Sequence, residues 1–166
     1  MDFDNAYNSY YRELYVFAFQ LTNCKQLSED LVQEAFLKFM REWKRGTAFI
    51  NIRAWLYKVV LNQFSTGVKI LKRRTVLTES VRNSEIPADD IHEQYTAKEI
   101  DNIVFEALSQ LKEKDRALLM LYRRGLPYSE IAEILDINPA SVGTTLARAI
   151  EKLKNNLKRS HHELFE

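Results

Sequence analysis

The chain has 166 residues, a formal net charge of +1 and one cysteine, Cys24. A single cysteine excludes an internal disulfide framework and agrees with a reducing compartment. Four glycines and three prolines, spread through long helical patterns, predict an all-α fold of one domain or two small ones. No apolar run is long enough to span a bilayer, and the acidic, polar start predicts no signal peptide.

Two helices are predicted before residue 46. Apolar and aromatic residues recur at helical spacing from Tyr7 to Leu21, which predicts one core-facing helix. Asn23 is suited to cap a second helix, with Gln26 at the capping-box position. Two adjacent apolar rows then run from Leu27 to Trp43, a wide apolar face typical of a small bundle, and Gly46 ends the helix.

A third helix is predicted from about Asn51, with Ile52 to Val60 supplying its apolar positions. Gly67, beside Ser65 and Thr66, weakens helix propensity, so we expect a kink or loop between Asn62 and Gly67. A basic run from Lys69 to Arg74 follows.

Charge divides the chain into parts. Residues 1–75 carry 12 basic and 7 acidic side chains, residues 76–97 carry 1 and 5, and residues 98–166 carry 11 of each. Residues 76–96 show little periodicity and contain Pro87-Ala88-Asp89-Asp90, which predicts a flexible acidic linker. The pattern therefore predicts two small helical domains, 1–75 and 97–160, with a short tail at 161–166.

The second domain begins with apolar stripes from about Thr96 to Gly125, and a helix-turn-helix is predicted from Leu126 to Leu153. Ala132 is small enough for a crossing helix to approach closely. Asp136 tolerates the left-handed backbone of the corner. Asn138 and Pro139 are suited to the N-cap and first position of the next helix.

The second helix of this motif is expected to bury Val142, Leu146, Ala149 and Leu153. Short hydroxyls and an arginine would then face a duplex: Ser141, Thr144, Thr145 and Arg148. From Arg148 to Arg159 the chain has five cations, including Lys152, and one acid, a balance suited to a phosphate backbone or to a solvated helix end.

Three motifs carry a resemblance to a known family. Asp30-Leu31-Val32-Gln33-Glu34 resembles the centre of its core-binding helix. Trp55-Leu56-Tyr57 followed by Asn62 resembles its next segment, and Tyr128-Ser129-Glu130-Ile131-Ala132 resembles the entry to its helix-turn-helix. In this order, the motifs resemble a bacterial RNA polymerase sigma factor of the extracytoplasmic-function (ECF) group of the sigma-70 family, over nearly the whole chain.

The resemblance implies a role for each residue set. Asp30, Leu31, Gln33 and Glu34 would bind core polymerase. Asn62 matches the position that holds a base flipped out of the minus-ten element, where an amide can pair with a base edge. Further contacts to that element would come from Trp55, Tyr57, Lys58, Lys69, Lys72, Arg73 and Arg74, although Trp55 and Tyr57 also suit a core. Contacts to the minus-thirty-five element would come from Ser141, Thr144, Thr145, Arg148 and Lys152.

The implied partners are core RNA polymerase, promoter DNA and an anti-sigma protein. The polymerase contacts would be the clamp helices of the largest subunit and the flap of the second-largest. Gly143, Thr145 and Ile150 stand where the family often has cations, so placement is expected to rely on the minus-ten element or on a further DNA-bound protein. The resemblance implies work in the bacterial cytoplasm, without membrane insertion or cofactor.

Three other classes of function account for these residues less well. A stand-alone helix-turn-helix regulator would leave the Asp30–Glu34 face and Asn62 without a role. A helical adaptor would use the aromatic first helix. An enzyme is disfavoured because His92, His161 and His162 lack metal-ligand spacing, and no nucleophile or phosphate-loop motif is present.

Overall fold

The computed structural model describes residues 2–75 and 94–160, with side chains placed for residues 2–67 and 100–159. The described residues form helices and no strands, which confirms the all-α prediction. The chain divides into two compact units, 1–84 and 85–166. The first unit holds α1 (Phe3–Thr22), α2 (Lys25–Lys44) and α3 (Ile52–Thr75); the second holds α4 (Gln94–Ser109), α5 (Glu113–Arg123), α6 (Tyr128–Leu135), the short 3₁₀ helix η1 (Pro139–Ser141) and α7 (Val142–Ser160).

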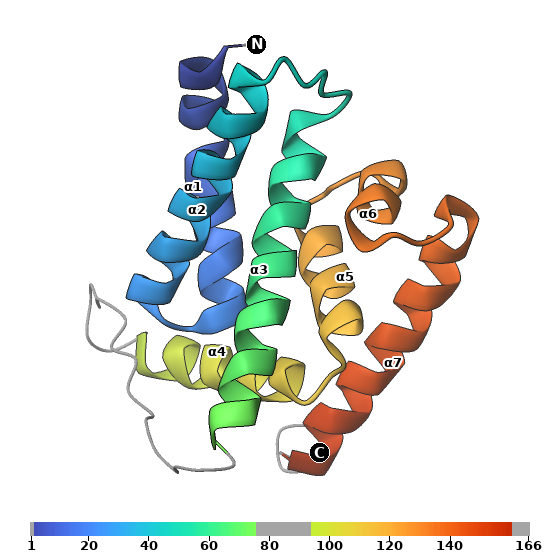
Figure 1. Ribbon diagram of the computed structural model, residues 1–166. Helices are drawn as coiled ribbons and strands as arrows, with labels where there is room; N and C mark the ends of the chain where they lie inside the picture. Colours follow the sequence, from blue (N-terminus) through green and yellow to red (C-terminus); the bar gives the residue numbers. More distant parts are fainter. Residues whose placement is uncertain (1, 76–93, 161–166) are drawn as a thin grey trace. The chain divides into compact units, whose positions relative to one another are not determined.

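In the first unit, α1 and α2 lie side by side in opposite directions, and α3 packs against both (Figure 1). Each helix buries one apolar face, as its spacing predicts. The fully buried side chains include Leu14, Phe17, Val32, Phe39, Leu56, Tyr57 and Val60. The charged faces of the three helices therefore remain in solvent.

An aromatic cluster closes one end of this bundle. Phe39 of α2 is fully buried, and its ring centroid lies 6.1 Å from that of Phe3, 5.0 Å from Phe49 and 6.0 Å from Trp55. Phe49 and Trp55 meet edge to face at 5.2 Å. The cluster therefore joins α1, α2, α3 and the loop 45–51 between α2 and α3.

The turn between α1 and α2 differs from the prediction. Asn23 does not cap the start of α2; it ends α1 in the left-handed region, with φ 50° and ψ 32°, and its N–H donates to the Phe19 carbonyl. Cys24 holds the N-cap position of α2. Asparagine suits both positions from local sequence, but the short turn requires a left-handed residue that a non-β-branched polar side chain tolerates.

The expected break between Asn62 and Gly67 is wrong as well, because α3 runs unbroken from Ile52 to Thr75. The Thr66 hydroxyl donates to the Asn62 carbonyl at 2.9 Å, the usual helical back-bond. One glycine costs only about 1 kcal/mol relative to alanine, and the helix formers that follow it propagate the helix.

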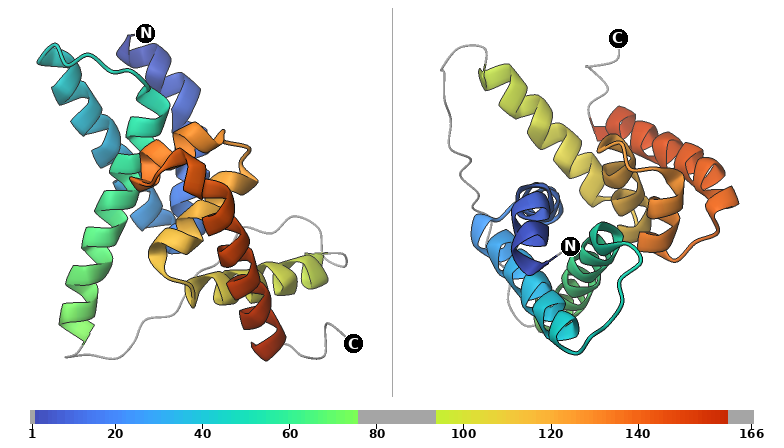
Figure 2. Two further views of the ribbon diagram at one scale, coloured as in Figure 1. Left: turned by 90° about the vertical axis from the view of Figure 1, so that its right-hand side faces the viewer. Right: turned by 90° about the horizontal axis from the view of Figure 1, so that it is seen from above.

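In the second unit, α5, α6 and α7 share a core that includes Leu118, Leu121, Ile131 and Val142, and α7 also packs against α4 (Figure 2). The Asn156 amide donates to the Ala107 carbonyl at 3.2 Å, which links the end of α7 to α4. Ile100 of the predicted α4 stripe is exposed. The linker predicted at 76–96 lies outside the described residues up to 93, and α4 begins at Gln94. Within the described ranges, no helix combines the length and apolar character that a membrane span requires.

Replacing Gly67 by alanine is expected to raise the free energy of unfolding by about 0.5–1 kcal/mol, because the helix no longer bears glycine's backbone entropy. Nothing lies within 4 Å of the added Cβ. Chemical denaturation followed by circular dichroism measures the change. Gly46→Ala is the matched control: its site is equally open, but φ is +79°, so this variant should lose stability. Loss of stability at position 67 would contradict the continuous helix.

Candidate nucleic-acid interface

The corner between α6 and α7 has the geometry that the sequence predicts. Asp136 ends α6 at φ 53° and ψ 52°, and Ile137 N–H donates to the Ala132 carbonyl at 3.1 Å. Ala132 is buried. The Asn138 side chain accepts from Ala140 N–H at 2.9 Å, with Pro139 at the next position. The second helix of the motif therefore starts at a fixed point. The short 3₁₀ helix η1 leads directly into α7 at Val142.

The helix α7 has a buried face and an outer face. Val142, Leu146 and Ala149 are buried, and Leu153 is half-buried. Thr144 and Arg148 are exposed on the other side. The structure thus places these two residues of the predicted set where a duplex can reach them.

Three other residues of that set have partners inside the unit. The Ser141 hydroxyl donates to the Asn138 carbonyl, and the Thr145 hydroxyl donates to the Ser141 carbonyl, each at 2.8 Å. Lys152 Nζ lies 2.6 Å from Asp115 Oδ2, and that carboxylate side chain is only 13% exposed. These contacts hold η1 and α7 in place and tie α7 to α5.

Gly143 on α7 lies next to the ring of Tyr128, and the space between them would accept a larger residue. A Cβ at this position would lie 3.7 Å from the Tyr128 ring, an ordinary contact. Tyr128 also lies beside Tyr122, with ring centroids 6.3 Å apart, and both tyrosines are exposed. The side of α7 next to α6 is therefore aromatic near Gly143, one of the positions where the family often has cations.

The outer face of α2 in the first unit is polar. Asp30 and Gln33 are exposed, and Glu34 pairs with Arg41 at 3.0 Å. Leu31 is buried in the bundle core, so the expectation that it contacts polymerase is not met in this structure. Its side chain follows the apolar rows of α2, which point inward.

On α3, Asn62 is exposed and Lys58 is half-buried. Tyr57 is fully buried, with its ring 4.9 Å from Phe17, so it offers no stacking surface in this structure. Trp55 is half-buried against Phe49 and Phe39. The apolar stripe of α3 thus takes both rings into or along the core. Lys69, Lys72, Arg73 and Arg74 lie on the last turns of α3, and their side chains are outside the described set.

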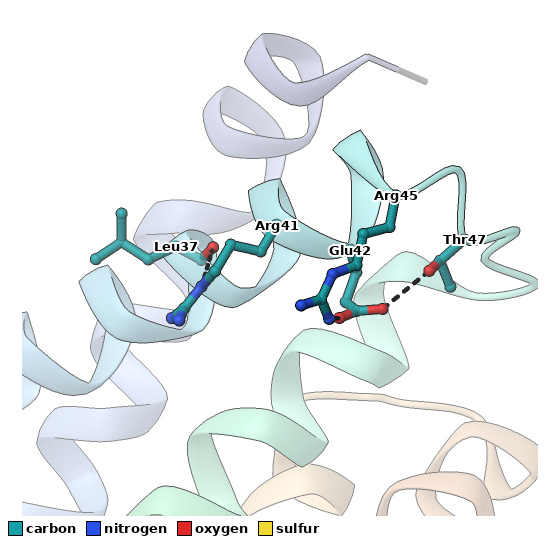
Figure 3. A network of polar contacts seen from close by, with 5 residues as sticks. All are labelled: Leu37, Arg41, Glu42, Arg45 and Thr47. Atoms are coloured by element: carbon teal, nitrogen blue, oxygen red, sulfur yellow. Dashed lines mark hydrogen bonds and ion pairs between the residues drawn. The ribbon is translucent and has the colours of Figure 1, made fainter.

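A basic pocket, which sequence reasoning missed, opens between the end of α2 and the start of α3. Its volume is about 360 Å³, and its lining residues are Lys38, Arg41, Glu42, Arg45, Thr47 and Trp55. Glu42 accepts from Arg45 at 2.8 Å and from Thr47 at 2.9 Å (Figure 3). Cations at 38, 41 and 45 follow helical spacing, which was a usable signal, but only the chain reversal after Gly46 places Thr47 and Trp55 beside them.

Among the side chains that the structure describes, no cluster of histidine, cysteine and carboxylates could hold a metal ion. The described surfaces are those of a binding protein: a helix-turn-helix in one unit, and a polar helix face with a basic pocket in the other. Together they define a DNA-binding protein with a second, separate interaction module.

Comparisons with known proteins identify this class. Residues 6–74 match the family model of sigma-70 region 2, and residues 101–153 match that of sigma-70 region 4. The RNA polymerase sigma factor YlaC of Bacillus subtilis is 30% identical, with 96% of this chain and 94% of that protein aligned. The ECF RNA polymerase sigma factor SigM of the same organism is 28% identical, over 93% and 94%. The chain belongs to the sigma-70 family of RNA polymerase sigma factors, in its ECF group.

A solved structure supports the fold. The sigma factor RpoE from Bartonella quintana, solved in complex with the anti-sigma factor NepR, superimposes with a TM-score of 0.70 at 23% identity, covering 95% of this chain and 97% of that one. The family assignment makes this chain a promoter-specific transcription initiation factor and favours that reading over the stand-alone regulator.

Arg148 and Lys152 should behave differently when each is replaced by alanine. Arg148 is exposed, so its loss should weaken duplex binding and reduce the salt dependence by about one phosphate contact. Lys152 is engaged by Asp115, so its loss should mainly lower stability, by up to about 1 kcal/mol. Fluorescence anisotropy at several salt concentrations, with thermal unfolding of each variant, separates the two effects. Equal salt slopes for both variants would contradict the assignment.

Proposed function

We propose that the two units act jointly in promoter opening. The polar face of α2 binds the clamp helices of the polymerase's largest subunit, Asn62 holds a base flipped out of the minus-ten element, and α7 docks on the minus-thirty-five element. The polymerase supplies the phosphodiester chemistry, and this chain supplies position and selectivity in the bacterial cytoplasm. It needs no catalytic residue and no cofactor for this task.

The observation that supports base capture is the setting of Asn62. A helix-capping role would explain an asparagine here if α3 ended nearby, but α3 continues for more than three turns to Thr75. The Asn62 side chain is exposed on a helix whose opposite side is anchored in the core by Val60 and Leu61. An amide held on a rigid helix is suited to pair with a base edge.

The energetics agree with this role. Unstacking and flipping a base costs a few kcal/mol, and a site that binds only the flipped base recovers much of that cost. A hydrogen-bonded amide pair contributes about 1–3 kcal/mol of discrimination. Opening therefore requires no nucleotide hydrolysis, provided that the polymerase holds the unit on the promoter.

The α2 face supports polymerase binding through charge. Asp30 and Gln33 are exposed, while the apolar rows beneath them fix the helix against α1 and α3. An anti-sigma protein that covers this face would block polymerase binding, and we propose such a partner for this chain. The flap of the second-largest subunit would meet the second unit, and another DNA-bound protein would aid placement where α7 lacks cations.

Asn62→Ala should lower promoter opening by about ten- to one-hundredfold, because one to two hydrogen bonds to the captured base are lost. Its affinity for core polymerase should stay unchanged. The measurements are permanganate reactivity of the minus-ten element and pull-down with core enzyme. Asn8→Ala, at an exposed site on α1, is the matched control and should open normally. Equal promoter opening by both variants would contradict the base-capture role of Asn62.

Asp30→Lys should weaken core-polymerase binding by about tenfold or more, because a like charge would replace an attractive one at the interface. A titration of labelled core enzyme, at two salt concentrations, measures the change. Asp4→Lys reverses an exposed charge on α1 of the same unit and should leave this affinity unchanged. If Asp30→Lys binds core polymerase as the unaltered chain does, the α2 face is not the contact.

A further inference from the structure

The outer face of α7 consists of four residues, which are all exposed and whose spacing of three and four residues places them on one side of the helix: Thr144, Ala147, Arg148 and Glu151. The opposite side holds Val142, Leu146 and Ala149, which are buried in the core that α7 shares with α5 and α6 (Figure 1). The outer face is therefore presented by a helix whose other side is anchored.

The length of the outer face matches a short stretch of duplex. Thr144 and Glu151 are seven residues apart, about 10 Å along the helix axis. Base pairs of B-DNA are stacked about 3.4 Å apart, so this distance spans about three base pairs. The major groove is about 12 Å wide and admits an α-helix. Side chains of the outer face can therefore reach the edges of consecutive bases.

The charge of the outer face is balanced, unlike that of a phosphate-binding surface. Arg148 supplies a cation, and Glu151, three residues later, supplies an anion. The neighbouring Lys152 is engaged by Asp115 at 2.6 Å. A carboxylate repels phosphate but accepts a hydrogen bond from the amino group of cytosine. The outer face is therefore better suited to base edges than to the phosphate backbone.

The other two residues of the outer face offer methyl groups. Ala147 ends in a methyl group, and Thr144 carries one beside its hydroxyl. Alanine and the threonine methyl are apolar groups that contact the 5-methyl group of thymine in the major groove. Thymine alone among the four bases carries this group, so a contact to it identifies the base.

We propose that Thr144 and Ala147 are specificity-determining residues that contact the methyl groups of two neighbouring thymines in the minus-thirty-five element. Arg148 then donates to guanine, and Glu151 accepts from cytosine, in adjacent base pairs. This inference rests on the proposed docking of α7 on that element and adds the bases that this chain selects there. Selectivity at the outer face comes from base edges, because its balanced charge gains little from phosphate.

The test begins with a duplex library randomised at the minus-thirty-five element, from which the chain assembled with core polymerase selects its preferred sequence. Each thymine of that sequence is then replaced by uracil, which removes only the 5-methyl group. The unaltered chain should lose affinity by about fourfold at each of two thymines, as expected when one methyl group leaves an apolar contact. Competition binding with the assembled polymerase measures each loss.

Two variants assign the contacts. Thr144→Ser keeps the hydroxyl and removes the methyl group, so it should bind the thymine and uracil duplexes equally at one of the two positions. Ala147→Gly should do the same at the other position. The cost of glycine to the helix weakens binding to both duplexes equally, so it cancels in the comparison.

Thr145→Ser is the matched control, because Thr145 is half-buried and serine can keep its bond to the Ser141 carbonyl. This variant should keep the full loss on uracil at both positions. A selected sequence without thymine, or uracil duplexes that bind as thymine duplexes do, would overturn the methyl contacts. A loss on uracil that persists in both Thr144→Ser and Ala147→Gly would overturn them as well. Selection of no preferred sequence at all would instead contradict the proposed docking of α7.

Discussion

The packing of Phe39 constrains most of the first unit. Its ring is fully buried and meets Phe3 of α1, Phe49 of the loop 45–51 and Trp55 of α3. Removing a buried phenylalanine typically costs about 3–5 kcal/mol. Because one ring joins three helices and a loop, the exposed groups on those elements are held at fixed positions relative to each other. The polar face of α2, the basic pocket and Asn62 all depend on that arrangement.

In the second unit, backbone conformation fixes the positions of the helices relative to each other. Asp136 ends α6 in the left-handed region, Ala132 is buried, and the Asn138 cap starts the next helix. The hydroxyls of Ser141 and Thr145 then bond to backbone carbonyls within η1 and α7. Ser141 and Thr145, two of the residues predicted to contact DNA, therefore help to build the motif, whereas Thr144 and Arg148 of that predicted set are exposed.

The sequence predicted features whose cause is local or periodic. The spacing of apolar residues predicted the helices. Asp136, Asn138 and Pro139 predicted the corner, because each has a backbone preference that acts within a few residues. The sequence-based prediction was wrong where a distant contact or a second local preference determines the structure. Asn23 suits both the end of one helix and the start of the next. Gly67 weakens α3 without ending it. The ring of Tyr57 is suited to stacking on bases, but the bundle buries it. The bond between Lys152 and Asp115 joins positions 37 residues apart, beyond the reach of any local pattern.

If the proposed DNA contacts hold, the exposed groups favour promoter selectivity in the first unit over the second. On α7, Gly143 and Ile150 supply no charge, and Lys152 is engaged by Asp115. A duplex contact there gains less from phosphate attraction, which supplies much of nonspecific affinity. In the first unit, by contrast, the basic pocket and Asn62 lie on one rigid scaffold, so the proposed contacts to a melted strand would need little reorganisation. If Asn62 captures a flipped base as proposed, recognition would discriminate promoters by the cost of unstacking as well as by base contacts, because a sequence that resists opening would also lose the capture of its base.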